Sequence, residues 1–353
     1  MAQWLNEALL TLRKEPDNTH QLMDSHDSNG GLLCSLIFVV PLIWVLATHL
    51  WMRSAYTSHV FHLQGFLEQY SSGVYRYRIV GRELLLSTYR LLSDHRKDQA
   101  FSMPTDTEAT LLFYAAYVLL NAVFFFFSNL MLLLLLRDRK KGVSDLHLAL
   151  YLFVVLLLVL SAYTVTPYDQ LAYFFMLICF LSVRIRRPLA MYLVLGIAAV
   201  VGSLNRESQY LVTPALLTVA LFTTPEESRR YFYAGLYHLF LFAGCYLGLR
   251  IFLPGVPMVA AGITLGGKWA LPSLIVLITV FYCGVSMAMR EYANRRPAIV
   301  LLLLSAPYIV TVLLSGELRE LRLLIPLLLC LIFVYVQLTA LRNRALAFGA
   351  DLV

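Results

Sequence analysis

Charged residues are scarce in this sequence. Asp, Glu, Lys and Arg together make up 14% of its 353 residues, whereas hydrophobic residues make up 59%. A typical soluble domain is about 25% charged and about 45–50% apolar. A chain this apolar cannot cover its surface in water, and a lipid bilayer solves that problem. We therefore predict an all-α, polytopic integral membrane protein rather than a soluble domain.

The sequence also lacks the short motifs of several common activities. It contains no GxGxxG, Walker A, GxSxG or HExxH pattern, which counts against nucleotide-driven transport, serine hydrolysis and a zinc site. Its five cysteines all fall in apolar runs without CxxC spacing, so we expect them to pack as small apolar residues. We predict no cofactor and no resident metal, and leave open a divalent cation that accompanies the substrate.

Acidic residues are fewer than basic ones, and the formal net charge is +7. The basic residues come in short clusters between apolar runs, and no nucleic-acid-binding motif accompanies them. Such clusters are typical of cytoplasmic loops, which carry an excess of Lys and Arg. We therefore interpret the charge as a sign of membrane topology and predict no nucleic-acid partner.

About ten apolar runs are long enough to suggest membrane-spanning helices, which need roughly 20 residues each. The runs lie at residues 33–52, 110–136, 146–165, 168–183, 189–204, 208–223, 231–252, 271–289, 298–314 and 321–341. The connections between them are short except for 53–108. The sequence thus predicts one transmembrane domain over 33–342, flanked by a polar tail at 1–32 and a short tail at 343–353.

The distribution of basic residues predicts the orientation of these spans. With the N-terminus in the cytoplasm, the inside loops and the C-terminal tail carry fourteen Lys and Arg residues, and the short outside loops carry five. Long loops escape this rule, so 53–108 is not counted. The first 32 residues are polar and no cleavable signal peptide is evident. We expect both termini in the cytoplasm, loop 53–108 outside, and a bacterial inner membrane as the location.

The long first outside loop contains a segregated pattern of apolar and basic residues. Arg78 and Arg82 lie one helical turn apart, and an apolar stripe of Ile79, Leu86 and Tyr89 continues along the same segment. This pattern predicts an amphipathic surface helix within 75–92, preceded by a shorter helix at about 59–70. The helix could simply lie on the membrane surface. Alternatively, its arginines could face a lipid phosphate, which guanidinium groups bind with two parallel hydrogen bonds.

Three further outside turns carry charges at the same membrane boundary. Asp169 follows Thr166 and Pro167, which we predict as N-cap and first residue of a helix whose dipole favours the carboxylate. The other turns hold Arg206 with Glu207, and four charges within 317–322. Local salt bridges could explain each turn alone. Because ionisable groups at this depth are costly, we expect these turns to share one polar cavity that opens outward.

Four segments of the chain, in this order and on this side, resemble the GT-C superfamily of integral membrane glycosyltransferases. They are Tyr75-Arg76-Tyr77-Arg78, Pro167-Tyr168-Asp169, Asn205-Arg206-Glu207-Ser208 and Glu320-Leu321-Arg322-Leu323-Leu324-Ile325-Pro326. The resemblance covers about 33–342, including the long first outside loop. It implies a membrane glycosyltransferase that moves a sugar from a polyprenyl-phosphate carrier to a glycan, lipid or protein acceptor outside the cytoplasm.

The resemblance also implies roles for individual residues. Many family members use an acidic residue of the first outside loop as general base, but this sequence has no Asp soon after the first span and no DxD in that loop. The catalytic candidates are Glu68, Glu83 and Asp169. The candidates for binding the lipid phosphate or substrate are Arg76, Arg78, Arg82, Arg206, Glu207, Glu320 and Arg322. Two alternatives stay open: a polysaccharide polymerase or ligase that uses undecaprenyl-linked substrates, and a non-catalytic membrane subunit of a cell-envelope assembly.

Overall fold

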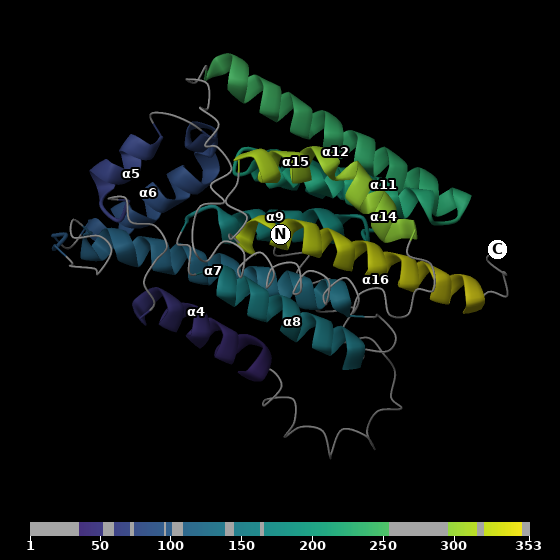
Figure 1. Ribbon diagram of the computed structural model, residues 1–353, viewed down its shortest axis with the longest axis horizontal. Helices are drawn as coiled ribbons and strands as arrows, with labels where there is room; N and C mark the ends of the chain where they lie inside the picture. The colour runs from purple at the N-terminus through teal and green to yellow at the C-terminus, as the bar shows by residue number, and fades with distance from the viewer. Residues whose placement is uncertain are drawn as a thin grey trace. The chain divides into compact units, whose positions relative to one another are not determined.

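The computed structural model describes nine stretches of the chain, and the described residues are helical apart from short connections (Figure 1). The stretches are 35–51, 60–70, 74–94, 97–100, 109–137, 145–162, 166–253, 296–315 and 321–347. The chain divides into two compact units, Met1–Pro41 and Leu42–Val353. Of the first unit, residues 35–41 are described, and they form η1 and the start of α4. The other described residues belong to the second unit.

The helices begin and end close to the predicted apolar runs. They are η1 (Ser35–Val39), α4 (Val40–Trp51), α5 (Leu63–Gln69), η2 (Val74–Tyr77), α6 (Ile79–Ser93), α7 (Leu111–Leu136), α8 (Asp145–Ser161), α9 (Asp169–Ser182), α10 (Pro188–Ser203), η3 (Glu207–Leu211), α11 (Val212–Leu221), α12 (Pro225–Phe252), α14 (Arg296–Leu304), α15 (Ala306–Ser315), η4 (Leu321–Leu323) and α16 (Ile325–Ala347). Nine of the ten predicted runs overlap these helices, and the tenth, 271–289, lies outside the described residues. The all-helical class is therefore confirmed for the described chain.

Three described helices are long and apolar enough to cross a bilayer: Leu111–Leu136, Pro225–Phe252 and Ile325–Arg342. At a rise of about 1.5 Å per residue, each of them reaches the roughly 30 Å of a hydrocarbon core or comes close to it. Four others, in α4, α8, α9 and α10, are apolar but shorter. These helices are consistent with an integral membrane protein, whereas the number of ten crossings stays a prediction.

The long helices differ in how much of their apolar surface the protein covers. In the most apolar part of α16, 78% of the residues are buried, whereas the corresponding figure for α12 is 17%. α16 packs against α7, α9 and α11, and α12 against α10 and α11. The uncovered side of α12 carries large apolar side chains such as Phe240 and Ile251. Such a surface suits lipid, in which exposed apolar side chains carry no penalty.

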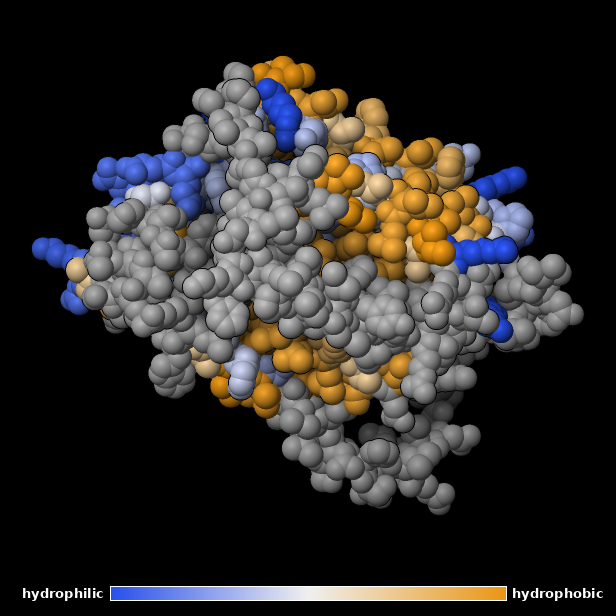
Figure 2. Space-filling view, viewed as in Figure 1, coloured by the Kyte–Doolittle hydropathy of each residue, from blue (hydrophilic) through white to orange (hydrophobic). Residues whose placement is uncertain are grey.

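Among the residues that Figure 2 colours, apolar ones form most of the visible surface, and hydrophilic ones gather toward its two ends. One polar end lies over α5 and α6. At the opposite end, Arg184 donates to the carbonyl oxygens of Leu134 and Leu135 at the end of α7, and Arg230 donates to the carbonyl oxygen of Ile185. These basic residues belong to the loops that the charge bias predicts to be cytoplasmic.

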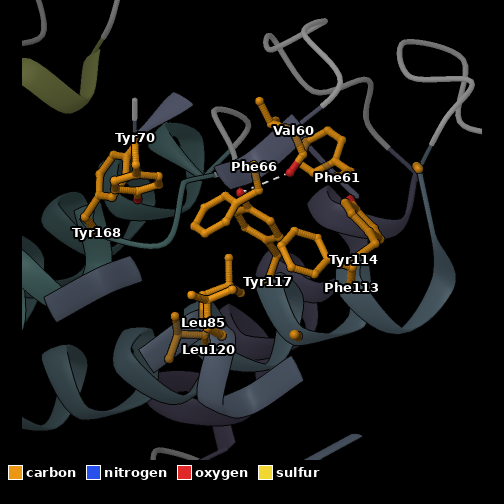
Figure 3. Packing of buried hydrophobic residues seen from close by; sticks show 13 residues of the cluster. Val60, Phe61, Phe66, Tyr70, Leu85, Phe113, Tyr114, Tyr117, Leu120 and Tyr168 are labelled. Atoms are coloured by element: carbon orange, nitrogen blue, oxygen red, sulfur yellow. Dashed lines mark hydrogen bonds between the residues drawn. The ribbon is translucent and has the colours of Figure 1, made fainter. Parts of the chain in front are cut away.

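The long loop 53–108 folds partly as a packed layer on the N-terminal half of α7 (Figure 3). Phe66 of α5 and Leu85 of α6 are fully buried against Phe113 and Tyr117 of α7. The Tyr117 hydroxyl donates to the carbonyl oxygen of Val60 at 3.2 Å and ties the start of this layer to α7. Helices α5 and α6 lie where helices were predicted, whereas their place at a membrane surface stays a prediction. The apolar stripe of α6 packs on protein.

α9 begins beside the middle of α7 rather than at its start. Phe174 contacts Phe124 and Phe127 of α7, and the Ser128 hydroxyl donates to the carbonyl oxygen of Gln170 at 3.3 Å. The first turns of α7 therefore extend beyond the start of α9. Since α6 packs on the N-terminal half of α7, it lies beside the charged start of α9.

Candidate functional site

The carboxylate of Asp169 occupies the first position of α9 and is almost fully buried. A carboxylate at a helix N-terminus is favoured by the helix dipole. The predicted start of this helix is wrong, because Thr166 is not its N-cap and Pro167 is not its first residue. Tyr168 holds the N-cap position, and no side chain caps the backbone there. Instead, the Thr166 hydroxyl donates to Asp169 Oδ2 at 2.6 Å, so the turn before α9 fixes the carboxylate itself.

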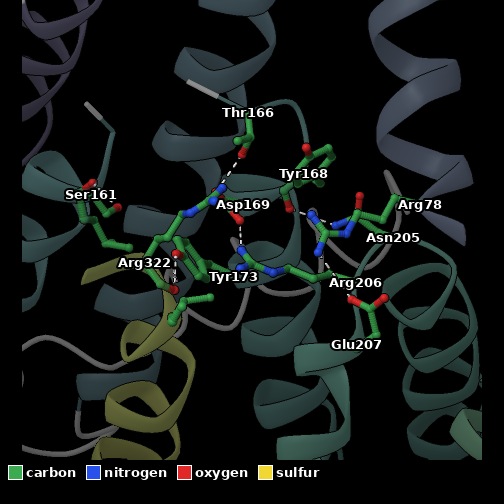
Figure 4. A network of polar contacts seen from close by, with 12 residues as sticks. Arg78, Ser161, Thr166, Tyr168, Asp169, Tyr173, Asn205, Arg206, Glu207 and Arg322 are labelled. Carbon is green, nitrogen blue, oxygen red and sulfur yellow. Dashed lines mark hydrogen bonds and ion pairs between the residues drawn. The ribbon is translucent and has the colours of Figure 1, made fainter. Parts of the chain in front are cut away.

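Two arginines from distant segments share this carboxylate (Figure 4). Arg322 of η4 donates from Nη1 to Asp169 Oδ2 at 3.1 Å, and Nη1 of Arg206 is paired with Asp169 Oδ1. The three side chains are 7%, 5% and 7% exposed for Asp169, Arg206 and Arg322. Charges this buried are tolerated because each has an opposite charge within contact. We call these three residues the ion triad.

Hydrogen bonds from side chains to backbone carbonyl oxygens hold the arginine-bearing segments around the triad. The Tyr173 hydroxyl donates to the carbonyl oxygen of Arg322 at 3.1 Å, and the Tyr308 hydroxyl donates to the carbonyl oxygen of Leu323 at 2.9 Å. η4 is therefore tied to α9 and to α15. The turn after α10 is tied to the start of α9 by Asn205, whose side-chain amide donates to the carbonyl oxygen of Tyr168 at 2.9 Å.

A second, more exposed ion pair lies beside the triad. Arg78 Nη2 lies 3.6 Å from Glu207 Oε2, and the two side chains are 12% and 31% exposed. The Arg78 guanidinium also lies over the rings of Tyr75 and Tyr168, at 5.1 and 4.5 Å from their centroids. Burial alone would lower the pKa of Arg78, but the Glu207 carboxylate together with Tyr168 and Tyr75 outweighs that effect and raises the pKa above its ordinary value. We call these two residues the rim pair.

Gly81 explains how α6 can bring Arg78 so close to the triad. A Cβ atom at position 81 would lie 2.9 Å from the side-chain oxygen of Asn205 and 3.2 Å from the carbonyl oxygen of Pro167. Only a glycine fits this contact without a shift of its neighbours. The amide of Val80 also donates to the carbonyl oxygen of Leu204, at 3.4 Å. The long loop 53–108 and the turn after α10 are thus in direct contact.

The structure brings together five of the ten residues that sequence reasoning selected. They are Arg78, Asp169, Arg206, Glu207 and Arg322. Separate segments of the chain therefore meet at one place, whereas the predicted cavity that opens outward and the chemical role of these residues stay predictions.

The other selected residues take different positions. Glu83 is half-exposed and pairs with the neighbouring Arg82 at 2.8 Å. Glu68 is exposed and accepts a hydrogen bond from the side-chain amide of Gln64 at 3.2 Å. Arg76, in η2, is partly buried, and Glu320 lies outside the described residues. Of the three carboxylates selected as catalytic, only Asp169 therefore belongs to the ion cluster, by which we mean the ion triad together with the rim pair. It is enclosed by two guanidinium groups.

Sequence reasoning missed the residues that assemble the site without carrying its charge. Tyr173 and Tyr308 hold η4, and Gly81 admits the close approach of α6. A tyrosine or glycine inside a helix gives no local signal of such a contact. Tyr75, Tyr168 and Asn205 did fall within the segments that carry the family resemblance, but no particular function could be read from them.

The site is suited to an anion rather than to a resident metal. Across the described stretches, no three His, Cys, Asp or Glu side chains gather closely enough to hold a metal ion, and both carboxylates of the cluster face guanidinium groups. Arginine forks bind phosphate and carboxylate groups. A partly exposed arginine can bind a phosphate, and a carboxylate beside it can accept a proton. No family model, curated protein or solved structure matches the chain.

Proposed function

We propose that this chain is an integral membrane glycosyltransferase that moves a sugar from a polyprenyl-phosphate carrier to an acceptor on the non-cytoplasmic side of a bacterial inner membrane. The observation that supports this proposal most is the convergence of three arginines and two carboxylates from four segments: the N-cap of α6, the start of α9, the turn after α10 with the start of η3, and η4. Charges from four segments, clustered at one end of apolar helices, suit a reaction at headgroup depth.

The chemistry asks little of the protein. The carrier lipid brings the activated sugar, so no nucleotide is needed. A carboxylate takes the proton of the acceptor hydroxyl, and a cation stabilises the negative charge that collects on the departing lipid phosphate. A single donor aimed at such a charge contributes about 3–4 kcal/mol to the transition state. Arg78 is the guanidinium group of the cluster that a phosphate reaches most easily, because Arg206 and Arg322 are enclosed with Asp169.

Glu207 replaces the earlier candidates as the proposed base. It belongs to the rim pair and its side chain is 31% exposed, so an acceptor hydroxyl can approach it. Asp169 is less suitable, because two guanidinium groups stabilise its ionised form and Thr166 occupies one of its oxygens. We assign Asp169 a positioning role, holding Arg206 and Arg322 together. Glu68 and Glu83 have no assigned role.

The test is an assay of the full chain reconstituted in lipid nanodiscs with labelled polyprenyl-phosphate sugars and candidate acceptors. We expect release of the polyprenyl phosphate together with labelled product. Arg78→Ala is expected to lower turnover by about a hundredfold or more, and Glu207→Gln by a similar factor. Arg90→Ala is the matched control, because Arg90 is an exposed arginine in the last turn of α6, and it should keep wild-type turnover.

Two other outcomes correspond to the alternative functions. Release of polyprenyl diphosphate from undecaprenyl-diphosphate-linked glycans, with no reaction of the monophosphate donors, indicates a polymerase or ligase. Tight binding of polyprenyl phosphate without turnover of any donor indicates a non-catalytic subunit. Either result contradicts the proposed transferase activity.

A further inference from the structure

The rim pair is held by electrostatic attraction without a hydrogen bond. Its closest nitrogen and oxygen, Arg78 Nη2 and Glu207 Oε2, lie 3.6 Å apart. Charge-assisted N–H···O bonds are normally about 2.7–2.9 Å long. By contrast, Arg322 makes a hydrogen bond of 3.1 Å within the triad. The rim pair is therefore looser than the Arg322–Asp169 pair.

Both partners of the rim pair have unused hydrogen-bonding atoms. Arg78 Nε and Glu207 Oε1 are buried, and neither has a hydrogen-bond partner in the described part of the chain. Nε and Nη2 form one edge of the guanidinium fork, the edge that donates two parallel bonds to a phosphate or carboxylate. The Oδ1 atom of Asn205 is also buried and without a partner. Buried polar atoms of this kind normally find a partner, so the fork lacks its full complement of acceptors.

The guanidinium plane is nevertheless fixed in place. It lies over the rings of Tyr75 and Tyr168, and these contacts do not use the N–H groups in its plane. Aromatic faces attract a cation by their quadrupole. Arg78 can therefore exchange one acceptor for another without losing its position.

We propose that the donor's phosphate displaces Glu207 from Arg78, and that this exchange frees the Glu207 carboxylate to act as the base. The inference rests on the proposed function and adds an order of events to it. In the free protein the Glu207 carboxylate lies against Arg78, at 3.6 Å. With a phosphate in the Nε–Nη2 fork, the carboxylate faces the incoming acceptor, so the base is released only when a donor is bound.

The acceptor hydroxyl gives its proton to Glu207 while its oxygen bonds to the anomeric carbon of the sugar. The bond from that carbon to the phosphate oxygen breaks, and its electron pair stays on the phosphate that Arg78 holds. Glu207 then gives its proton to water, and the departing polyprenyl phosphate leaves Arg78 to the carboxylate again. The products are the glycosylated acceptor and polyprenyl phosphate.

The exchange predicts that one substitution has opposite effects on binding and on turnover. Glu207→Gln removes the charge that competes for Arg78 and keeps the size of the side chain. We expect it to bind polyprenyl phosphate about tenfold more tightly than the wild type, while its turnover of the polyprenyl-phosphate sugar falls by about a hundredfold. Arg78→Lys is used because Arg78→Ala could fail to fold. It should bind polyprenyl phosphate less tightly than the wild type. In the double variant it should remove most of the gain in affinity that Glu207→Gln gives.

Binding is measured with polyprenyl phosphate in nanodiscs by native mass spectrometry, with the neutral polyprenol as the control lipid and inorganic phosphate as competitor. Competition by inorganic phosphate at low concentration means that the fork recognises any phosphate, and its failure means that the lipid chain contributes. Unchanged or weaker binding by Glu207→Gln overturns the exchange. If wild type binds the lipid, Glu207→Gln binds it more tightly and neither transfers sugar, the exchange survives and the proposed transferase function fails.

Discussion

Arg322 donates a hydrogen bond of 3.1 Å to Asp169 from a position 153 residues further along the chain. The same carboxylate is paired with Arg206, which comes from a third segment. Asp169 is thus the point at which α9, the turn after α10 and η4 are joined. Because all three side chains are buried, their pairing bears on stability as well as on any chemistry.

The first prediction concerns this joint. Asp169→Asn leaves two buried guanidinium groups side by side, and breaking a buried ion pair by removing one partner costs about 3–5 kcal/mol. We expect a clear fall in the melting temperature of the detergent-solubilised protein, larger than that of Arg322→Ala, which leaves the Asp169–Arg206 pair. Arg187→Ala, at an exposed residue before α10, is the control. Equal melting of Asp169→Asn and wild type would mean that the triad does not join the segments.

The sequence predicted the level of these charges but not their partners. Asp169, Arg206 and Arg322 lie at the ends of apolar runs, so their depth follows from counting apolar residues. Local explanations, such as pairing of Arg206 with Glu207, were equally consistent with the sequence. The pairing observed depends on how α9, α10 and α16 pack, and apolar helices with nearly uniform faces give little sign of that.

The first outside loop illustrates the same limit. The stripe with Leu86 predicted an amphipathic helix, and α6 follows it closely. Amphipathicity alone does not say whether the apolar face meets lipid or protein. In the structure, the apolar face of α6 packs against the aromatic layer that includes Phe113 and Tyr117. Glu68 and Glu83 seemed suitable as bases because they lie in the expected loop, but both side chains turn away from the buried face of their helices and are exposed.

The second prediction concerns the contact at Gly81. Gly81→Val places bulk within 2.9 Å of the Asn205 side chain and 3.2 Å of the Pro167 carbonyl, so α6 must shift and carry Arg78 away from Glu207. We expect transfer activity to fall at least tenfold. Gly244→Ala is the control, because a Cβ atom there meets nothing within 4 Å, and an alanine in a helix stabilises it by up to about 1 kcal/mol. Activity in Gly81→Val equal to that of the control would contradict the close contact.

The third prediction tests the orientation. In a cysteine-free background, Ser93→Cys at the end of α6 should react with a membrane-impermeant thiol reagent added to intact cells. Arg187→Cys, between α9 and α10, should react only after the membrane is opened. The expectation follows from the fourteen-to-five bias in basic residues. The reverse labelling pattern would place the ion cluster on the cytoplasmic side and rule out an extracytoplasmic transferase.

The fourth prediction separates charge from shape at the rim pair. Arg78→Lys keeps a cation but loses the planar fork and much of the stacking on Tyr75 and Tyr168. We expect turnover between that of wild type and that of Arg78→Ala, with weaker binding of polyprenyl phosphate. Full activity in Arg78→Lys, measured by release of the lipid phosphate, would show that a point charge is sufficient and that the two-pronged contact has no role.

The central claim is that Arg78 holds the phosphate of a lipid carrier, and a structure of the full chain in nanodiscs with bound polyprenyl phosphate tests it most directly. We predict phosphate density within about 3 Å of Nε and Nη2 of Arg78, and a Glu207 carboxylate farther from that guanidinium than 3.6 Å. Phosphate density at the opposite end of the helices, beside Arg184 and Arg230, with the rim pair still in contact, would contradict the account.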